Sequence, residues 1–316
     1  MNRKVTIIGA GAVGSAIGYL LVAESMASEI VFIDVNKEKA LGEAMDIYQA
    51  TPFLSPAIVR AGEYEDAKDS ELVIITSGLA RKPGQTRIDL AQTNVNIIKS
   101  IAPQITAVAP NAIYIIVANP VDVLTYTFHQ ITNIPSERII GSGTSLDTAR
   151  LRTRLSEIYK VSPKQVHANV LGEHGDTSFV AWSMARIAGV PLDEYAAVRT
   201  EKDGEEITLN KAEVLDYVKK SGGVIIQRKG ATYNGVAAAV VYICKSIFTG
   251  VDSILCVSTL LKGEYGIEDV CVSIPVVLGK EGIVSTLTPT LTDEEIELLR
   301  TSANAMKDVI NQVNCK

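Results

Sequence analysis

A glycine-rich segment near the start of the chain constrains the fold more than any other feature of the sequence. It reads Gly9-Ala10-Gly11-Ala12-Val13-Gly14, follows the apolar run at residues 5–8 and opens a helical pattern. Gly9 allows a tight turn, Gly11 lets the backbone approach a pyrophosphate, and Gly14 lets the helix pack on the strand. The N-terminus of the helix adds unpaired N–H donors and a positive dipole. The segment therefore predicts a strand-turn-helix unit that binds a dinucleotide.

An acidic residue at the end of the next apolar run supports this prediction. Asp34 follows residues 30–33 and lies 20 residues after Gly14. A carboxylate at this spacing accepts hydrogen bonds from the adenosine ribose. Because it would also repel a 2′-phosphate, it favours NAD over NADP. We therefore expect Gly9, Gly11, Ala12, Val13, Gly14 and Asp34 to bind NAD.

The first 140 residues alternate short β-rich apolar runs with helical patterns. This alternation predicts a doubly wound parallel sheet with helices on both faces. Strands are expected at residues 5–8, 30–33, 57–60, 72–76, 113–117 and 138–140. Helices are expected at residues 11–22, 36–49, 88–108 and 121–131.

The regular alternation of apolar runs and helical patterns ends after residue 141, which predicts a second, mixed α+β domain. A helical pattern at residues 145–159 leads to short strands near 166–171 and to a helix near 181–188. Thr292 and Glu295 have the spacing of a capping box ahead of an apolar stripe, so a terminal helix should begin there. We expect an NAD-binding domain at residues 1–142 and a substrate domain at residues 143–316.

Charge and cysteine content narrow the possible partners and location. The net charge of −6 gives no basic excess with which to bind a nucleic-acid backbone. Glycines interrupt the uncharged run at residues 5–23, which argues against a membrane span. The four cysteines have no Cys-x-x-Cys spacing, so we expect buried thiols, no metal site and a cytoplasmic location.

Three polar segments carry the candidate catalytic residues. His174 lies in Leu-Gly-Glu-His-Gly-Asp after a β-rich run, where its ring could project into a cleft. Asp147 and Arg150 are three residues apart near the first turn of the predicted helix at 145–159, on one helix face. The segment 77–87 contains Gly78 and Gly84, which could act as hinges of a lid that carries Arg87.

These segments together resemble the NAD-dependent lactate and malate dehydrogenases over essentially the whole chain. The resemblance implies a Rossmann domain, a mixed α/β substrate domain and hydride transfer between a nicotinamide and a 2-hydroxy or 2-oxo acid. The matching motifs are Gly9 to Gly14 with Asp34, Lys82-Pro83-Gly84 with Arg87, Asn119-Pro120-Val121-Asp122, Leu146-Asp147 with Arg150, Gly172-Glu173-His174-Gly175-Asp176 and Lys229-Gly230-Ala231-Thr232.

The roles implied by the resemblance agree with the chemistry of the residues. Reduction of a 2-oxo acid places negative charge on the carbonyl oxygen, so His174 would supply a proton and Asp147 would stabilise the imidazolium. Arg150 suits bidentate capture of the substrate carboxylate, and Arg87 on the lid would polarise the ketone after closure excludes water. Asn119 would orient the substrate or the nicotinamide.

The motifs conflict on which acid is the substrate. Most resemble lactate-type members, but the lid resembles malate-type members, with Arg81 where lactate-type members usually have Gln. A lid arginine would pair with the second carboxylate of oxaloacetate and would be left unpaired by pyruvate, at a cost of about 2–5 kcal/mol. We therefore expect a malate dehydrogenase, with an L-lactate dehydrogenase as the alternative if Arg81 points to solvent.

Other observations keep further interpretations open. Thr232 is typical of lactate-type members and lies in the expected substrate site. A 2-hydroxyacid dehydrogenase with a larger pocket is a third possibility. A protein of another class, which binds NAD without catalysis, would not need Asp147, Arg150 and His174 together.

Two residues resemble a regulatory site of the family. Arg152 and His167 match positions that bind fructose 1,6-bisphosphate across a subunit interface in bacterial lactate-type enzymes. The resemblance therefore implies a homotetramer or dimer with a possible effector site. We interpret His129, on a predicted amphipathic helix, as a structural residue.

Overall fold

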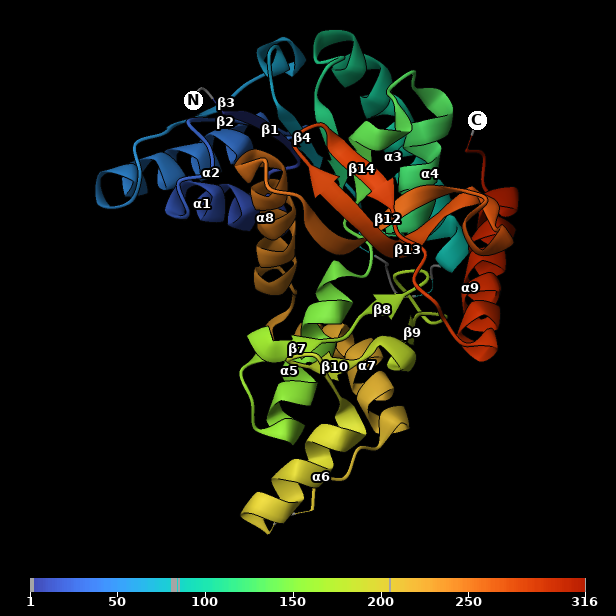
Figure 1. Ribbon diagram of the computed structural model, residues 1–316. Helices are drawn as coiled ribbons and strands as arrows, with labels where there is room; N and C mark the ends of the chain where they lie inside the picture. The colour runs from blue at the N-terminus through green and yellow to red at the C-terminus, as the bar shows by residue number, and fades with distance from the viewer. Residues whose placement is uncertain (1–2, 81–83, 85, 205, 316) are drawn as a thin grey trace.

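A nine-stranded sheet forms the centre of the computed structural model, which describes residues 3–80, 84, 86–204 and 206–315 (Figure 1). Its strand order is β14-β13-β12-β6-β5-β4-β1-β2-β3. The six parallel strands are β1 (Lys4–Ile8), β2 (Glu29–Ile33), β3 (Ile58–Ala61), β4 (Leu72–Ile75), β5 (Ile113–Ile116) and β6 (Ile139–Gly141). Every one begins and ends within one residue of the prediction. The doubly wound sheet expected from the sequence is therefore confirmed.

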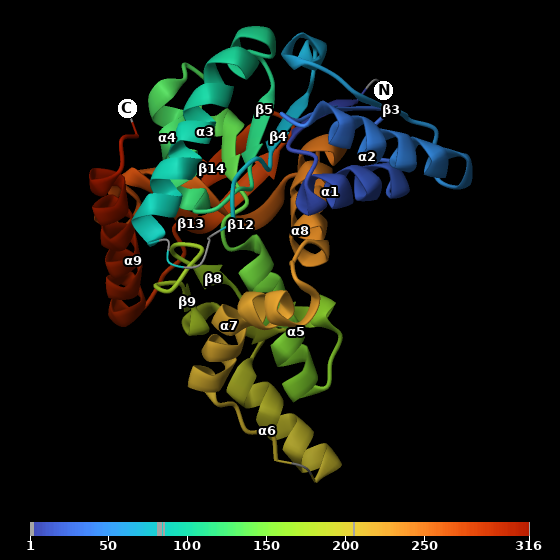
Figure 2. The ribbon, with the colours of Figure 1, turned by 180° about the vertical axis from the view of Figure 1, so that it is seen from behind.

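The helices between these strands also follow the sequence pattern. They are α1 (Ala12–Ala23), α2 (Lys37–Ala50), α3 (Arg87–Val108) and α4 (Val121–Ile131). Helices α1 and α2 lie with α8 (Asn234–Thr249) on one side, and α3 and α4 lie with α9 (Asp293–Gln312) on the other (Figures 1 and 2). Because helices cover both faces, all four residues of β4 are buried.

Strands from the second half of the chain extend the sheet beyond β6. They are β12 (Ser253–Lys262), β13 (Glu268–Gly279) and β14 (Gly282–Thr286), all antiparallel to their neighbours. Strand β12 pairs with β6 through Ser258 and Gly141. A Cβ at Gly141 would lie 2.7 Å from the Ser258 Cβ, so glycine lets the two strands approach. The sequence patterns did not indicate these three strands.

The remainder of the second half forms a smaller α+β layer below the sheet (Figure 1). Helix α5 (Ser145–Tyr159) has the predicted bounds, and it packs with α7 (Lys211–Lys229) over a separate buried cluster. Helix α6 (Leu192–Asp203) and the short strands complete the layer. The short strands are β7 (Val166–His167), β8 (Val170–Leu171), β9 (Phe179–Val180), β10 (Arg186–Ile187) and β11 (Val190–Pro191).

The helix expected at residues 181–188 is wrong. This segment contains only one 3-10 turn at Trp182–Met184, followed by strand β10. Strand β10 pairs with both β7 and β11. Ala188 and Gly189 have φ angles of 49° and 87°, which form the turn between β10 and β11. Pairing with neighbouring strands thus outweighs the helix propensity of an alanine-containing run.

Several local predictions agree with the structure. Thr292 accepts a hydrogen bond from the Glu295 N–H at 3.2 Å, and the Glu295 carboxylate accepts one from the Thr292 N–H at 3.1 Å, so the capping box starts α9. The four cysteines are free and buried. His129 is part of α4, and its pKa is lowered to about 4, mainly because the side chain is buried. None of the described helices is both long and apolar enough to span a membrane.

Candidate active site

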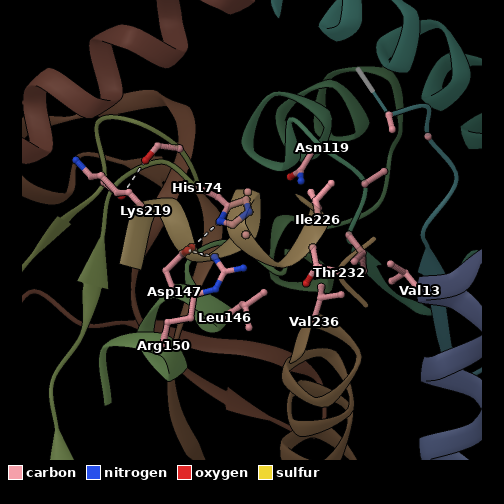
Figure 3. A pocket seen from close by; sticks show the side chains of 18 of the residues that line it. Val13, Asn119, Leu146, Asp147, Arg150, His174, Lys219, Ile226, Thr232 and Val236 are labelled. Carbon is pink, nitrogen blue, oxygen red and sulfur yellow. Dashed lines mark hydrogen bonds and ion pairs between the residues drawn. The ribbon is translucent and has the colours of Figure 1, made fainter. Parts of the chain in front are cut away.

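A pocket of about 460 Å³ lies where the second-half helices meet the carboxyl ends of β4 and β5 (Figure 3). The first turn of α5 contributes Asp147 and Arg150, and the turn after β8 contributes His174. Asn119 follows β5, and Thr232 precedes α8. The fold thus brings together five of the residues that the sequence indicated.

An ion-paired chain of three residues forms the polar centre of this pocket. The Nδ1 of His174 lies 2.5 Å from Asp147 Oδ2, and Arg150 Nη1 donates to Asp147 Oδ1 at 3.0 Å. The Asp147 side chain is 8% exposed, whereas that of His174 is 24% exposed. The carboxylate is therefore shielded, while the imidazole still borders the pocket.

The electrostatics of the pair favour a charged imidazole. Burial acts to lower the pKa of His174, but the Asp147 charge and hydrogen bond outweigh it and raise this pKa above its ordinary value. Burial acts to raise the pKa of Asp147, but His174 and Arg150 together hold it below the ordinary range. The arrangement can hold a proton on His174 near neutral pH.

A second buried carboxylate, which the sequence analysis did not single out, fixes the backbone of His174. Asp122 is in the first turn of α4, and its Oδ2 accepts a hydrogen bond from the His174 N–H at 2.8 Å. Asp122 is 2% exposed, and this burial raises its pKa to about 6. The Asn119 to Asp122 motif contained the signal, because it places a carboxylate at the start of a helix that begins near the site.

Further contacts hold the turn that carries His174. The Glu173 N–H donates to Ser302 Oγ on α9 at 2.7 Å. The Glu173 carboxylate accepts a hydrogen bond from the Thr177 N–H at 2.8 Å. Gly172 has a φ of 90°, a backbone conformation that glycine adopts readily. Contacts with α4 and α9, together with those inside the turn, therefore position the histidine.

The glycine-rich turn has the geometry of a dinucleotide cradle. A Cβ at Gly14 would lie 1.9 Å from the Gly9 carbonyl oxygen, so α1 can approach β1 only with glycine there. A Cβ at Gly11 would meet nothing within 4 Å, which leaves the N-terminus of α1 open to a ligand. Asp34 Oδ2 accepts a hydrogen bond from the Ala10 N–H at 2.7 Å. These residues fit an NAD molecule.

The other predicted cofactor residues are Ala12 and Val13, within this turn, and Asn119, after β5. Ala12 is exposed in the first turn of α1, and Val13 lines the pocket. The Asn119 carbonyl oxygen accepts a hydrogen bond from Asn94 Nδ2 at 2.6 Å, and Asn94 Oδ1 accepts one from the Leu79 N–H at 2.9 Å. Asn94 thereby ties the segment after β4 to the segment after β5.

The two arginines of the expected lid, Arg87 and Arg81, are not among the described residues that line the pocket. Arg87 is 69% exposed and its Nη2 pairs with Asp176 Oδ2 at 2.5 Å, and it is not among the pocket-lining residues. Its role in polarising a ketone stays a prediction. Arg81, on which the expectation of malate depended, lies outside the described residues, as do Lys82 and Pro83.

The two candidate effector residues lie near each other. Arg152 Nε donates to the Ala168 carbonyl oxygen at 3.1 Å, and Ala168 directly follows the exposed His167. Arg152 Nη2 also donates to Asn169 Oδ1 at 3.2 Å. Arg152 lines a second cavity of about 410 Å³ beside α5 and α8.

Helix α7 forms a pocket wall that the sequence analysis did not anticipate. Lys219, Gly222, Gly223 and Ile226 line the pocket. Lys219 Nζ donates to the Asp176 carbonyl oxygen at 2.6 Å. Two consecutive glycines in a helical pattern were the available signal, because glycine disfavours a helix interior and so often marks a close approach or a site.

Comparisons with known proteins cover both halves of the chain. Residues 3–141 match the family model described as lactate/malate dehydrogenase, NAD binding domain. Residues 144–316 match the model described as lactate/malate dehydrogenase, alpha/beta C-terminal domain. An L-lactate dehydrogenase of Acetivibrio thermocellus is 45% identical over 99% of this chain and 98% of its own length. L-lactate dehydrogenase 1 of Clostridium acetobutylicum is 43% identical over 99% of each chain.

Solved structures show the same similarity. A crystal structure of a minor L-lactate dehydrogenase from Enterococcus mundtii matches with a TM-score of 0.93 and 37% identity, covering 100% of this chain and 99% of the other. A lactate dehydrogenase from a Medee basin deep-sea metagenome library also matches with a TM-score of 0.93 and 37% identity, over 98% of each chain.

Proposed function

The chain belongs to the lactate/malate dehydrogenase family and is an NAD-dependent 2-hydroxyacid dehydrogenase, and from this premise we propose that it interconverts pyruvate and L-lactate. The observation that carries the proposal is end-to-end similarity, at 43–45% identity, to proteins named L-lactate dehydrogenase. Thr232 in the pocket lining supports the same substrate. The sequence motifs favoured malate as the substrate, and the similarity to these proteins favours lactate, the alternative.

His174 would act as the general acid and base. NADH, when bound along the glycine-rich turn, supplies a hydride to C2 of the 2-oxo acid. Negative charge then develops on the carbonyl oxygen, which takes the His174 proton as it forms the hydroxyl group. Asp147 stabilises the charged imidazole before this transfer, because its buried carboxylate lies 2.5 Å away. In lactate oxidation the neutral imidazole takes the hydroxyl proton.

Arg150 would bind the C1 carboxylate. One nitrogen of its guanidinium donates to Asp147, and the remaining donors of the planar group stay available for a substrate. Because the Arg150 side chain is 13% exposed, a carboxylate bound there is partly removed from water, which strengthens the interaction. Arg87 would polarise the carbonyl oxygen only after it exchanges Asp176 for the substrate.

Malate remains a second candidate because of Arg81. The deciding experiment measures NADH oxidation with pyruvate and oxaloacetate, by the natural protein and by Arg81→Gln. We expect a higher kcat/KM for pyruvate in the natural protein. A preference for oxaloacetate of about 100-fold, removed by Arg81→Gln, would refute the lactate proposal and show that the arginine selects a second carboxylate.

We also propose a homodimer or homotetramer in which Arg152 and His167 bind fructose 1,6-bisphosphate. Apolar side chains on the exposed face of α2, among them Met45 and Tyr48 at 53% exposure each, support an interface. Sedimentation with and without the bisphosphate measures the assembly, and NADH oxidation under the same two conditions measures the activity. A monomer under all conditions would contradict the assembly, and an unchanged activity and assembly with the bisphosphate would contradict the effector.

A further inference from the structure

The turn between β8 and β9 carries His174 and is closed by hydrogen bonds of its own. The Thr177 N–H donates to Glu173 Oε1 at 2.8 Å, so the side chain near the start of the turn binds the backbone near its end. The Gly175 N–H donates to the Glu173 carbonyl oxygen at 3.0 Å. Residues 173–177 therefore form a compact unit, and a shift of its start moves His174 with it.

Ser302, in the middle of helix α9, contacts both ends of this unit. Its Oγ accepts a hydrogen bond from the Glu173 N–H at 2.7 Å and lies 2.9 Å from Thr177 Oγ1. Ser302 is fully buried, and Glu173 is 129 positions earlier in the chain. Because the bond is buried, removal of the hydroxyl would leave the Glu173 N–H without a partner, which is a costly arrangement.

The glycine that precedes this unit shows how closely α9 approaches it. A Cβ at Gly172 would lie 2.5 Å from Ser302 Oγ and 3.0 Å from Ser302 Cβ. Gly172 also pairs with Ser273 on β13, since each N–H donates to the carbonyl oxygen of the other residue, at 3.0 and 2.8 Å. The backbone two residues before His174 is therefore held between β13 and α9, which pack on each other (Figures 1 and 2).

Three acceptors on three helices determine where the His174 ring lies. Ser302 on α9 binds the Glu173 N–H, and Asp122 on α4 binds the His174 N–H at 2.8 Å. Asp147 on α5 lies 2.5 Å from the ring Nδ1. Asp122 and Asp147 are carboxylates, whereas Ser302 is a neutral hydroxyl. Its removal therefore changes the geometry of the site without removing a charge.

We propose that Ser302 is a positioning residue for the proton transfer by His174, although it belongs to the last helix and does not line the pocket. The proposal rests on the proposed role of His174 as general acid and base. The Ser302 hydroxyl holds the Glu173 backbone and thereby keeps the ring within reach of Asp147 and of a substrate oxygen. Misplacement of a reacting group by about 1 Å lowers the rate about 100-fold.

A shift of the ring away from Asp147 also has an electrostatic signature. Burial lowers the pKa of His174, but the charge and hydrogen bond of Asp147 raise it above its ordinary value. With a longer distance the effect of Asp147 weakens, and the pKa of His174 falls. The other charges that act on the ring, Asp122 on α4 and Arg150 on α5, are unchanged in Ser302→Ala.

The test measures NADH oxidation with pyruvate or oxaloacetate, whichever is the better substrate, over a range of pH. Ser302→Ala should lower kcat/KM about 10- to 100-fold. The fall of kcat/KM at alkaline pH should begin about half a pH unit lower than in the natural protein, because reduction needs the charged imidazole. KM for NADH should change less than about twofold, because the glycine-rich turn is not altered. Ser302→Cys, which keeps a weak acceptor, should restore part of the activity.

Ser246→Ala is the matched control. Ser246 is also a buried serine in a helix, at 3% exposure, but its Oγ donates to the Tyr242 carbonyl oxygen of the same helix at 3.0 Å. It does not line the pocket, so kcat/KM should change less than about twofold. Thr177→Val tests the Ser302 contact from the turn, without a change in α9, and should lower kcat/KM in the same direction.

A double-mutant cycle with Asp147→Asn tests whether Ser302 acts through the catalytic pair. In this background Ser302→Ala should lower kcat/KM less than about threefold. An equal loss in both backgrounds, or a loss without a shift of the pH profile, would overturn the proposal. Full activity of both Ser302→Ala and Thr177→Val would also overturn it. Nearly full activity of His174→Gln would instead refute the proposed role of His174 itself.

Discussion

Replacing Asp147 with asparagine removes the charge that holds a proton on His174 while keeping an oxygen that can accept the Nδ1 hydrogen bond. The two side chains lie 2.5 Å apart, and the carboxylate side chain is 8% exposed. At an effective dielectric constant of about 20, unit charges about 4 Å apart interact by about 4 kcal/mol. Arg150 repels the imidazolium in both proteins, whereas the hydrogen bond that asparagine keeps makes the loss smaller than this.

We therefore expect the variant to stabilise the transition state by about 2–4 kcal/mol less than the natural protein does. This lowers kcat/KM for pyruvate roughly 30- to 1000-fold at about pH 8. The loss should shrink toward about pH 5.5. Without the Asp147 charge, burial lowers the pKa of His174, so only a more acidic solution supplies the proton. The measurement is the pH profile of kcat/KM for both proteins.

The matched control is Asp216→Asn on α7. Asp216 forms an exposed ion pair with Lys220 at 2.8 Å, so the same chemical change should alter kcat/KM less than twofold. A loss of equal size at both ends of the pH range in Asp147→Asn would refute the electrostatic reasoning. Asp147 would then act only by orienting the ring.

Three further predictions follow from the site. Because the pKa of His174 is raised, kcat/KM for pyruvate should stay high through about pH 6.5 and fall at more alkaline pH, and a fall already complete at about pH 6 would contradict this. Arg150→Lys keeps the charge but loses the planar pair of donors, so KM for pyruvate should rise about 100-fold with a smaller effect on kcat, and an unchanged KM would place the carboxylate elsewhere. Burial raises the pKa of Asp122 to about 6, so its ionisation destabilises the folded state as the pH rises from about 4 to 6, by roughly 3 kcal/mol. Urea unfolding of Asp122→Asn should show that the variant gains stability relative to the natural protein over this range, and a constant difference would argue against it.

The parallel half of the fold was predictable because local and global signals agree there. Strands such as β4 are continuous apolar runs that end at a turn, and their burial on both faces requires that composition. Site residues could also be predicted where they belong to one local motif, since Asp147 and Arg150 are three residues apart on one helix face. His174 could be connected to them only through the family resemblance.

The parts that were missed depend on contacts between distant segments. Within the run at residues 181–188, Arg186–Ile187 form strand β10 because β7 and β11 pair with them, which no local pattern indicates. Lys219 and Gly223 belong to the site only because of the face that α7 presents to the pocket. Arg87 pairs with the exposed Asp176, and its expected place beside the substrate stays a prediction.

The pairing of β6 with β12 has a consequence for the newly made chain. Strand β6 is flanked by β5 on one side and by β12 on the other, and its three residues are buried. During synthesis β5 is available early, whereas β12 emerges only after the whole second layer has been made. Until then β6 presents an unpaired apolar edge, which is a template for association with other chains. The nascent first half should therefore depend on chaperone protection, and a fragment that ends before β12 should aggregate where the complete chain folds.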